Sequence, residues 1–373
     1  MSRPRTVLIL HRGGDLLRGT EATLLSLLRG IDPGALRPIV VSTHPVMHEA
    51  AQALGVESHL RDDPELMLVQ GERRLPVGRY ARSFRELHRL ARDRAVDVFF
   101  CNGGGPCQLG VPLAAALRKP LVCYFHHPAP RLYHAWWLTR LARSLVFSSE
   151  YSAAHTRQKI GRTGEVVHPG IDAATRFLPA APRDPALRRS LGFADDDVVF
   201  AQFGALVPHK GHRTLVEAFA AAAGRAPSAR LLVIGDGPEA GPLRELVRER
   251  GLGERVVLTG WVDDVVPYLR HVADVGVLAS REEGLGLVNL QASACGLPNL
   301  ASDSTGIRET IDHGTTGFLF PPDDRAALAN LIVRLTHDPA LRATMGARGR
   351  AMVLTRVTED RSCQRMEAIL RAA

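Results

Sequence analysis

The 373-residue chain lacks several features that would place it in a narrow class at once. No apolar run approaches the roughly 20 residues needed to span a bilayer, and the run at residues 7–10 is too short for the core of a signal peptide. The five cysteines are odd in number and show no zinc-site spacing, which favours a reduced chain. No Gly-x-Gly-x-x-Gly follows the first apolar run, so a dinucleotide cofactor is not expected. We therefore expect a protein of the cytoplasm.

Lysine is also scarce. Only three lysines occur, at positions 119, 159 and 210, and the remaining basic charge is arginine. The formal net charge is nevertheless +8, and the isoelectric point lies near 9.7. Such a charge suits an acidic ligand, an anionic membrane surface or nucleic acid. No nucleic-acid-binding motif accompanies it, so nucleic acid is not an expected partner.

What the chain does have is a long alternation of apolar β-rich runs and helical patterns. The runs fall at residues 6–10, 38–42, 96–101, 121–125, 144–147, 165–168, 198–203, 230–234, 256–262, 275–278 and 317–320. Strands separated by helices indicate parallel sheets with helices on both faces. The length is too great for one compact core, so two or three domains are expected. A stretch rich in Pro, Ala and Arg, at about 178–191, is the expected linker.

The most distinctive stretch begins at Glu283, just before two glycines and a predicted helix from about Gly286 to Cys295. A helix start carries unpaired N–H groups and partial positive charge, which suits a phosphate. Gln291 would lie roughly 12 Å from Glu283 along the helix axis. One ligand with a sugar, a diphosphate and a ribose could contact both. The stretch therefore outlines a nucleotide-sugar site, and a plain surface loop with a glycine-stopped helix is the alternative.

Residues 283–298 read Glu-Gly-Leu-Gly-Leu-Val-Asn-Leu-Gln-Ala-Ser-Ala-Cys-Gly-Leu-Pro. This pattern resembles the signature of the retaining, GT-B-fold glycosyltransferases of glycosyltransferase family 4, the glycosyl transferases group 1. The resemblance covers nearly the whole chain. It implies an α/β protein with two Rossmann-like parallel-sheet domains facing across a cleft. These would be an N-terminal, acceptor-side domain at residues 1–178 and a nucleotide-sugar-binding domain at 192–355. A final helix at 356–373 would pack back toward the first domain.

The resemblance also implies an activity. A sugar would move from a nucleotide-diphosphate-sugar donor to a glycan, lipid-linked or small-molecule acceptor, with retention of anomeric configuration and without a metal or cofactor. By position, Lys210 would hold the diphosphate, Glu283 a sugar hydroxyl and His126 the donor sugar. The remaining expected binding residues are Gly284, Leu285, Gly286, Leu287 and Val288 for the diphosphate, Gln291 for the ribose, Gly19 for a phosphate, and Trp261 and Val262 for the base.

Several of these positions have a structural alternative. Gly19 could be a plain helix-start turn, His126 a satisfied structural residue, and Trp261 a core or interface residue. Residues 131–143 combine aromatic and basic side chains. They could touch a membrane that holds a lipid-linked acceptor, or form a helix packed on the sheet. Peripheral contact with the inner face of a membrane therefore stays open beside the cytoplasmic expectation.

Two positions depart from the family pattern. Ala205 stands where the family has an arginine that clamps the diphosphate, and Gln291 stands where it has a second glutamate. Arg281, Arg12 and Arg18 are possible substitutes for the missing arginine by placement. The departures motivate a second hypothesis, a non-catalytic relative that binds a glycan or a partner. A sugar epimerase or phosphorylase on the same fold is a third.

Overall fold

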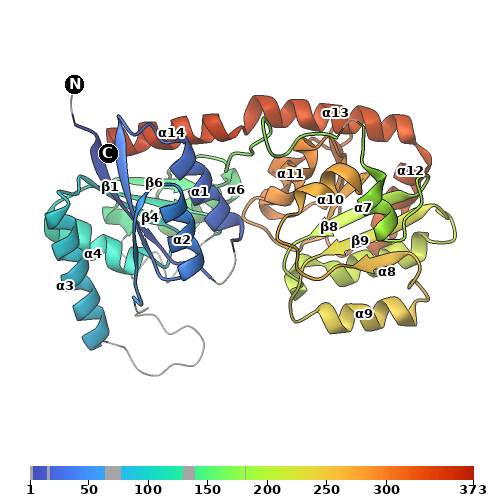
Figure 1. Ribbon diagram of the computed structural model, residues 1–373, viewed down its shortest axis with the longest axis horizontal. Coiled ribbons are helices and arrows are strands. Elements are labelled where there is room, and N and C mark those ends of the chain that lie inside the picture. Colours follow the sequence, from blue (N-terminus) through green and yellow to red (C-terminus); the bar gives the residue numbers. More distant parts are fainter. Residues whose placement is uncertain (1–2, 15–16, 64–76, 129–138, 181) are drawn as a thin grey trace. The chain divides into compact units, whose positions relative to one another are not determined.

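The computed structural model describes residues 3–14, 17–63, 77–128, 139–180 and 182–373. Its chain divides into two compact units (Figure 1). The first comprises Met1–Gly170 and Glu359–Ala373, and the second comprises Ile171–Thr358. The first unit is therefore discontinuous in sequence, with the second unit inserted between its two segments.

The first unit contains a parallel seven-stranded sheet, counted over the described residues, in the order β3-β2-β1-β4-β5-β6-β7. Its strands are β1 (Arg5–His11), β2 (Leu36–Ser42), β3 (Glu57–Leu60), β4 (Val98–Asn102), β5 (Leu121–Phe125), β6 (Ser144–Phe147) and β7 (Glu165–Val166). Its helices are α1 (Gly19–Gly30), α2 (Pro45–Ala53), α3 (Val77–Asp93), α4 (Cys107–Leu117), α6 (Glu150–Ile160) and α14 (Glu359–Ala372), with the 3-10 turn η1 (Thr139–Leu141). β4 and β5 are buried along their whole length, as expected for central strands of a parallel sheet.

The last helix, α14, belongs to this first unit. It runs beside α1 (Figure 1) and buries Met366, Ile369 and Leu370 in the core that α1 shares. The two helices approach so closely that a Cβ at Gly30 would lie 2.5 Å from the sulfur of Cys363. This close packing holds the carboxyl-terminal segment to the unit that begins the chain.

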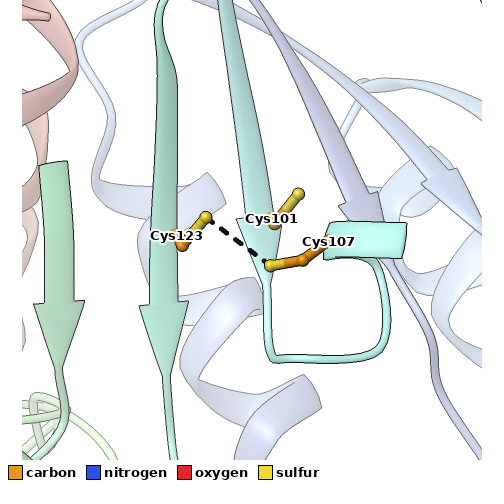
Figure 2. Close-up of side chains that lie close together, drawn as sticks. All are labelled: Cys101, Cys107 and Cys123. Carbon is orange, nitrogen blue, oxygen red and sulfur yellow. Dashed lines mark hydrogen bonds between the residues drawn. The ribbon is translucent and has the colours of Figure 1, made fainter. Parts of the chain in front are cut away.

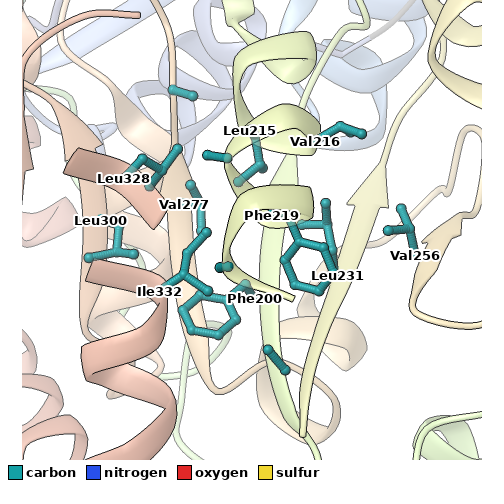
Figure 3. Packing of buried hydrophobic residues seen from close by; sticks show 14 of the residues in the cluster. Phe200, Leu215, Val216, Phe219, Leu231, Val256, Val277, Leu300, Leu328 and Ile332 are labelled. Carbon is teal, nitrogen blue, oxygen red and sulfur yellow. The ribbon is translucent and has the colours of Figure 1, made fainter. Parts of the chain in front are cut away.

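The second unit contains a parallel six-stranded sheet, again counted over the described residues, in the order β10-β9-β8-β11-β12-β13. Its strands are β8 (Val198–Phe203), β9 (Ala229–Ile234), β10 (Val256–Leu258), β11 (Val275–Leu278), β12 (Asn299–Ser302) and β13 (Gly317–Phe320). Its helices are α7 (Pro185–Ser190), α8 (His212–Ala222), α9 (Ala240–Glu249), α10 (Val266–His271), α11 (Leu287–Ala294), α12 (Arg325–His337) and α13 (Pro339–Arg356), with the 3-10 turns η2 (Pro208–Lys210) and η3 (Thr305–Thr310). On one face of the sheet, Phe200, Phe219 and Ile332 interlock α8 and α12 with the strands (Figure 3).

Both units thus have the parallel α/β architecture that the alternation of patterns predicts. The first segment of the first unit ends at Gly170, eight residues before the boundary expected at residue 178. The stretch taken as a linker, 178–191, contains α7, which starts where the Asp184 side chain accepts a hydrogen bond from the Ala186 amide. The buried Arg188 then donates to the carbonyl of Val272 at 3.0 Å, so this helix is part of the second unit.

Within the described part of the chain, we find no helix with both the length and the apolarity required to cross a bilayer. Residues 129–138, which carry most of the aromatic and basic patch that motivated the expectation of membrane contact, lie outside the described residues.

Candidate active site

The loop that carries Lys210 follows β8 and packs closely against the end of β11. Its last turn, η2, ends at Gly211, whose φ of 68° lies in the left-handed region. A Cβ at this position would lie 1.9 Å from the carbonyl oxygen of Ala279, so only glycine allows the approach. The backbone after Lys210 therefore contacts the chain just after β11 directly.

A buried glutamine braces the same junction. The Gln202 amide nitrogen donates to the Lys210 carbonyl at 2.8 Å, and its oxygen accepts from the Ala279 amide at 3.1 Å. The same nitrogen lies 3.0 Å from His212 Nδ1, and His212 Nε2 lies 3.3 Å from the Ala205 carbonyl. His212 therefore accepts through Nδ1 and donates through Nε2–H. Burial lowers the pKa of His212 to about 4, so the ring is neutral near pH 7.

Lys210 and Glu283 are brought into direct contact. The lysine Nζ lies 2.5 Å from Glu283 Oε1, and the Ser280 hydroxyl donates to the same oxygen at 2.9 Å. The Lys210 side chain is 23% exposed and that of Glu283 is 9% exposed, so the pair is largely shielded from water. The two side chains come from loops 73 residues apart in the sequence. The structure thus pairs two residues to which the sequence assigned separate ligand contacts.

The segment after Glu283 leads into α11. Gly286, with a φ of 94°, is the residue before the helix, and Leu287 and Val288 are its first two helical residues. The amide N–H groups of Leu287 and Val288 donate to no residue that the structure describes, as expected for a first helical turn. Gly284 and Leu285 are buried, and Gln291 is partly buried. The predicted helix start with unpaired amide donors is therefore present, and anion binding there stays a prediction.

Thr305, the first residue of η3, contacts the backbone of Glu283. Its φ is +42°, so the threonine adopts the left-handed conformation that usually favours glycine. Its hydroxyl accepts a hydrogen bond from the Glu283 amide at 2.9 Å. The next residue, Gly306, lies so close that a Cβ there would be 2.1 Å from the Gly284 carbonyl oxygen. The η3 turn thus holds the backbone of Glu283 in place through this hydrogen bond and through the close packing of Gly306.

The predicted base-binding residues follow β10. Trp261 is 48% exposed, which excludes the core position considered as its alternative. Val262 is partly buried and packs on the apolar cluster beneath the sheet. The Gly235 amide donates to the Gly260 carbonyl at 2.9 Å, which joins the ends of β9 and β10. Base recognition by Trp261 and Val262 stays a prediction.

Two predicted residues lie in the first unit. Gly19 is exposed and is the first residue of α1. His126 follows β5, is partly buried, and its Nε2 lies 2.7 Å from Asn102 Oδ1. Burial, with smaller contributions from His127 and His11, lowers the pKa of His126 to about 3. The described structure therefore places the candidate residues in two groups, one at the carboxyl ends of the strands of each sheet.

Comparison with known families assigns the chain. Residues 17–175 match the family model described as Glycosyltransferase Family 4, and residues 184–352 match that of Glycosyl transferases group 1. The chain belongs to this glycosyltransferase family. The family predicted from the signature stretch is thereby confirmed.

Individual relatives match this chain over different lengths. A GDP-mannose-dependent monoacylated alpha-(1-6)-phosphatidylinositol monomannoside mannosyltransferase of Corynebacterium glutamicum is 35% identical over 221 residues, which are 56% of this chain and 57% of that protein. A GDP-mannose-dependent alpha-(1-6)-phosphatidylinositol monomannoside mannosyltransferase of Mycolicibacterium smegmatis is 29% identical over 291 residues, 72% of this chain and 74% of that protein. The first of these matches thus spans less than two thirds of the relative.

Comparison with solved structures covers almost the whole of this chain. HepE of Anabaena, solved in complex with UDP-glucose, has a TM-score of 0.86 and 22% sequence identity, covering 99% of this chain and 100% of that chain. Together with the two parallel sheets, this likeness confirms the predicted GT-B fold class with two Rossmann-like domains.

The structure also describes the position where the family pattern has an arginine and this chain has Ala205. Ala205 is partly buried, and its carbonyl accepts from His212. Of the three proposed substitutes, only Arg281 belongs to the same unit as Lys210. Its amide donates to the His209 carbonyl at 2.8 Å, which places it beside the Lys210 loop, and its guanidinium pairs with Asp323 at 2.8 Å. Arg281 thus lies beside the Lys210 loop, and its role as a substitute stays a prediction.

Sequence reasoning missed the residues that position these groups. Gln202 and His212 read as ordinary members of a strand and a helix, and Asn102 as the start of a glycine-rich turn. Each is polar and almost completely buried close to the carboxyl end of a strand. A buried polar residue at that edge of a parallel sheet is the pattern that could have indicated them.

Three cysteines of the first unit also converge, although their spacing gave no sign of it. Cys101 on β4, Cys107 at the start of α4 and Cys123 on β5 have sulfurs within 4.8 Å of one another (Figure 2). The Cys107 thiol donates to the Cys123 sulfur at 3.5 Å. All three are fully buried, and a Cβ at Gly110 would lie 2.2 Å from the Cys101 sulfur. Buried free cysteines behave as small, soft side chains, which suits the close packing at Gly110.

Proposed function

We propose that the chain transfers a sugar from a nucleotide-diphosphate-sugar to a glycan, lipid-linked or small-molecule acceptor, with retention of anomeric configuration and without a metal. The observation that carries this proposal is the position of the Lys210 ammonium, which contacts Glu283 three residues before the glycine that precedes α11. A cation and two free amide donors, from Leu287 and Val288, are thus supplied by neighbouring segments.

Lys210 and the start of α11 would stabilise the departing diphosphate. The ammonium has three donor positions, and Glu283 takes one of them. The remaining positions can bind phosphate oxygens, and the amides of Leu287 and Val288 add fixed dipoles of the same sign. Stabilising the charge that develops on a leaving group usually contributes most to the acceleration of such a reaction. Because these groups supply positive charge themselves, we expect activity to survive a chelator such as EDTA.

Glu283 would bind the donor sugar. Its Oε1 already accepts from Lys210 and Ser280, whereas its Oε2 accepts from no residue that the structure describes. A carboxylate has acceptor capacity on both oxygens, so Oε2 can take a sugar hydroxyl without breaking the ion pair. The ion pair then serves to orient the carboxylate as well as to hold the lysine.

The donor and the acceptor are proposed from the relatives. Two matched relatives are named for GDP-mannose, so GDP-mannose is the first donor to test, followed by UDP-glucose, which HepE binds. Those mannosyltransferases act on phosphatidylinositol mannosides, while another matched relative, of Bacillus anthracis, is an N-acetyl-alpha-D-glucosaminyl L-malate synthase. Thermal-shift screening with a panel of nucleotide-sugars would identify the donor. The anomeric configuration of the product, read by NMR, would test retention.

The decisive experiment is release of free nucleoside diphosphate by Lys210→Ala. We expect at least a tenfold lower rate, because a charged hydrogen bond contributes about 1.5–3 kcal/mol and about 1.4 kcal/mol corresponds to tenfold. Lys159→Ala is the matched control, since Lys159 is exposed on α6 in the other unit. Equal rates for the two variants would refute the role of Lys210.

The comparisons do not favour the non-catalytic alternative, because the matched relatives are named as transferases. Calorimetry separates the two hypotheses. If no nucleoside diphosphate bound at millimolar concentration, the alternative would replace the proposal.

A further inference from the structure

A buried chain of polar side chains crosses the carboxyl edge of the first sheet. β1 ends at His11 and β4 at Asn102, and these residues are partners in the parallel register. Asn102 Nδ2 lies 3.0 Å from His11 Nδ1, and its Oδ1 lies 2.7 Å from His126 Nε2. On its other side, His11 Nε2 lies 3.4 Å from Glu21 Oε1 on α1. The order is therefore Glu21, His11, Asn102, His126, which we call the edge chain.

The direction of the edge chain is set by Asn102. An amide could be placed with its oxygen or its nitrogen toward His11. The Thr20 carbonyl lies 3.5 Å from Asn102 Nδ2, and a carbonyl can only accept. Nitrogen at that position satisfies Thr20 and His11 together, whereas oxygen there would face another oxygen. The Asn102 oxygen must then point to His126.

Each ring is fixed in turn by this direction. His11 Nδ1 accepts from Asn102, so its proton lies on Nε2, which faces the Glu21 carboxylate. Asn102 Oδ1 can only accept, so His126 donates through Nε2–H. A neutral imidazole carries one proton, which leaves His126 Nδ1 with a lone pair. No residue that the structure describes donates to that Nδ1.

The two ends of the edge chain are held. The Arg18 amide donates to Glu21 Oε2 at 3.1 Å. Although burial acts in the opposite sense, the His11 ring beside the carboxylate lowers the pKa of Glu21, so the charged acceptor persists near pH 7. At the other end, the His126 ring lies 4.3 Å from the Tyr124 ring, and its carbonyl accepts from the Ser148 hydroxyl at 3.0 Å. The ring orientation is thus set from both sides.

We propose that Glu21, His11 and Asn102 are positioning residues that hold His126 as its Nε2–H tautomer, so that Nδ1 accepts a hydrogen bond from a ligand hydroxyl. The consequence is selectivity by chemical class: an acceptor nitrogen binds a sugar hydroxyl and repels a phosphate or carbonyl oxygen. The choice of a sugar hydroxyl rests on the proposed function, whereas the tautomer does not.

The tautomer is measured directly by NMR of the full-length protein labelled with ¹⁵N in the histidine rings. Protonated and bare ring nitrogens resonate far apart, and His126→Gln and His11→Gln spectra assign the two signals. We expect bare Nδ1 and protonated Nε2 in both rings at pH 7. A proton on His11 Nδ1, or a bare His126 Nε2, would mean that the edge chain runs the other way and would overturn the proposal. The wild-type spectrum decides this without any substrate.

Asn102→Asp sharpens the test. A carboxylate accepts on both sides, so the His11 proton must move to Nδ1, or that ring must become doubly protonated, while His126 keeps Nε2–H. Asn102→Leu removes both hydrogen bonds, and the His126 signals should then average between tautomers. His127→Gln is the control, because His127 is an exposed neighbour outside the edge chain, and it should leave both signals unchanged. Unchanged signals in Asn102→Leu would overturn the positioning role.

Binding provides an independent readout. Asn102→Leu should weaken binding of the nucleotide-sugar about tenfold, the loss of one hydrogen bond to a positioned group, and leave the affinity for the nucleoside diphosphate unchanged. An equal loss for both ligands would indicate general damage and contradict the proposal. If no nucleotide bound to the wild type, the proposed function would fail while the tautomer measurement would stand.

Discussion

Each unit contains a buried amide that hydrogen-bonds a buried histidine, and the two pairs differ in what the amide oxygen meets. Asn102 and Gln202 both direct nitrogen to a histidine Nδ1 at 3.0 Å. The oxygen of Asn102 meets the His126 side chain, whereas the oxygen of Gln202 meets the backbone amide of Ala279. The first pair therefore sets the protonation of a candidate binding group, and the second sets the shape of the loop that carries Lys210.

The comparison shows that the same hydrogen bond between an amide and a histidine can set the protonation of a ring or fix the shape of a loop. In the first unit, contacts between side chains alone connect Glu21 to His126 and orient each group along the edge chain. In the second unit, the close backbone approach at Gly211 positions the loop, and Lys210 and Glu283 pair with each other. The following predictions test that difference, from the largest expected effect to the smallest.

Gly211→Ala should strongly destabilise the second unit if backbone approach positions the Lys210 loop. The new Cβ would lie 1.9 Å from the Ala279 oxygen, and φ is +68°. Left-handed strain and overpacking together should lower the free energy of unfolding by at least about 3 kcal/mol. Gly251→Ala is the matched control, because its φ is +64° and no atom lies within 4 Å of the new Cβ. It should cost about 1 kcal/mol. Calorimetry compares them, and equal losses would show that the close approach is not required.

His212 should make the second unit sensitive to acid. Its pKa is about 4 in the folded protein and about 6.5 when unfolded, so the unfolded chain binds more protons as the pH falls below 6.5. The stability loss begins there and is complete below pH 4. Between pH 7 and pH 5 it should amount to about 2 kcal/mol. Over the same pH interval, the free energy of unfolding of His212→Gln, measured by urea titration, should fall by about 2 kcal/mol less than that of the wild type. His337→Gln, at an exposed position of α12, should lose as much stability as the wild type. If His212→Gln also lost as much as the wild type, His212 would not be the cause of the acid sensitivity.

Arg281→Ala should have the smallest effect. Its side chain is 57% exposed and already paired with Asp323, so it would act as an auxiliary cation near the Lys210 loop. We expect a loss in nucleotide-sugar affinity of about threefold, within the range for exposed charges. Arg248→Ala is the control, since Arg248 is also exposed and ion-paired, with Glu245 on α9. A loss as large as that of Lys210→Ala would make Arg281 a full replacement for the missing family arginine.

Much of the architecture was predictable because central parallel strands are apolar throughout. Among the strands that lie outside the predicted apolar runs, β3 is at the edge of its sheet and reads Glu-Ser-His-Leu, without a buried residue. Likewise, the α7 segment was hidden by its proline and arginine content, although Pro185 at a helix start is favourable. Composition misled where a short helix needs tertiary contacts to form.

The candidate site was predictable where one contiguous stretch carries it. Glu283, Leu287 and Val288 lie within six residues, so their proximity follows from the chain itself. The contact between Lys210 and Glu283 depends on β8 lying beside β11, and that between His11 and Asn102 on β1 lying beside β4. The order of strands in a parallel sheet cannot be deduced from one sequence. The structure was therefore needed to identify these two contacts. Their roles in binding remain predictions.

The inserted arrangement of the chain has a consequence for engineering. Ile171 and Thr358, the first and last residues of the second unit, form an isolated parallel bridge, with the Ile171 amide donating to the Val357 carbonyl at 2.9 Å. The points where the chain leaves and rejoins the first unit are therefore neighbours. A linker of a few residues could therefore join Gly170 to Glu359, which would give the first unit alone with α14 retained. In the same way, the second unit could be replaced by the corresponding unit of a relative.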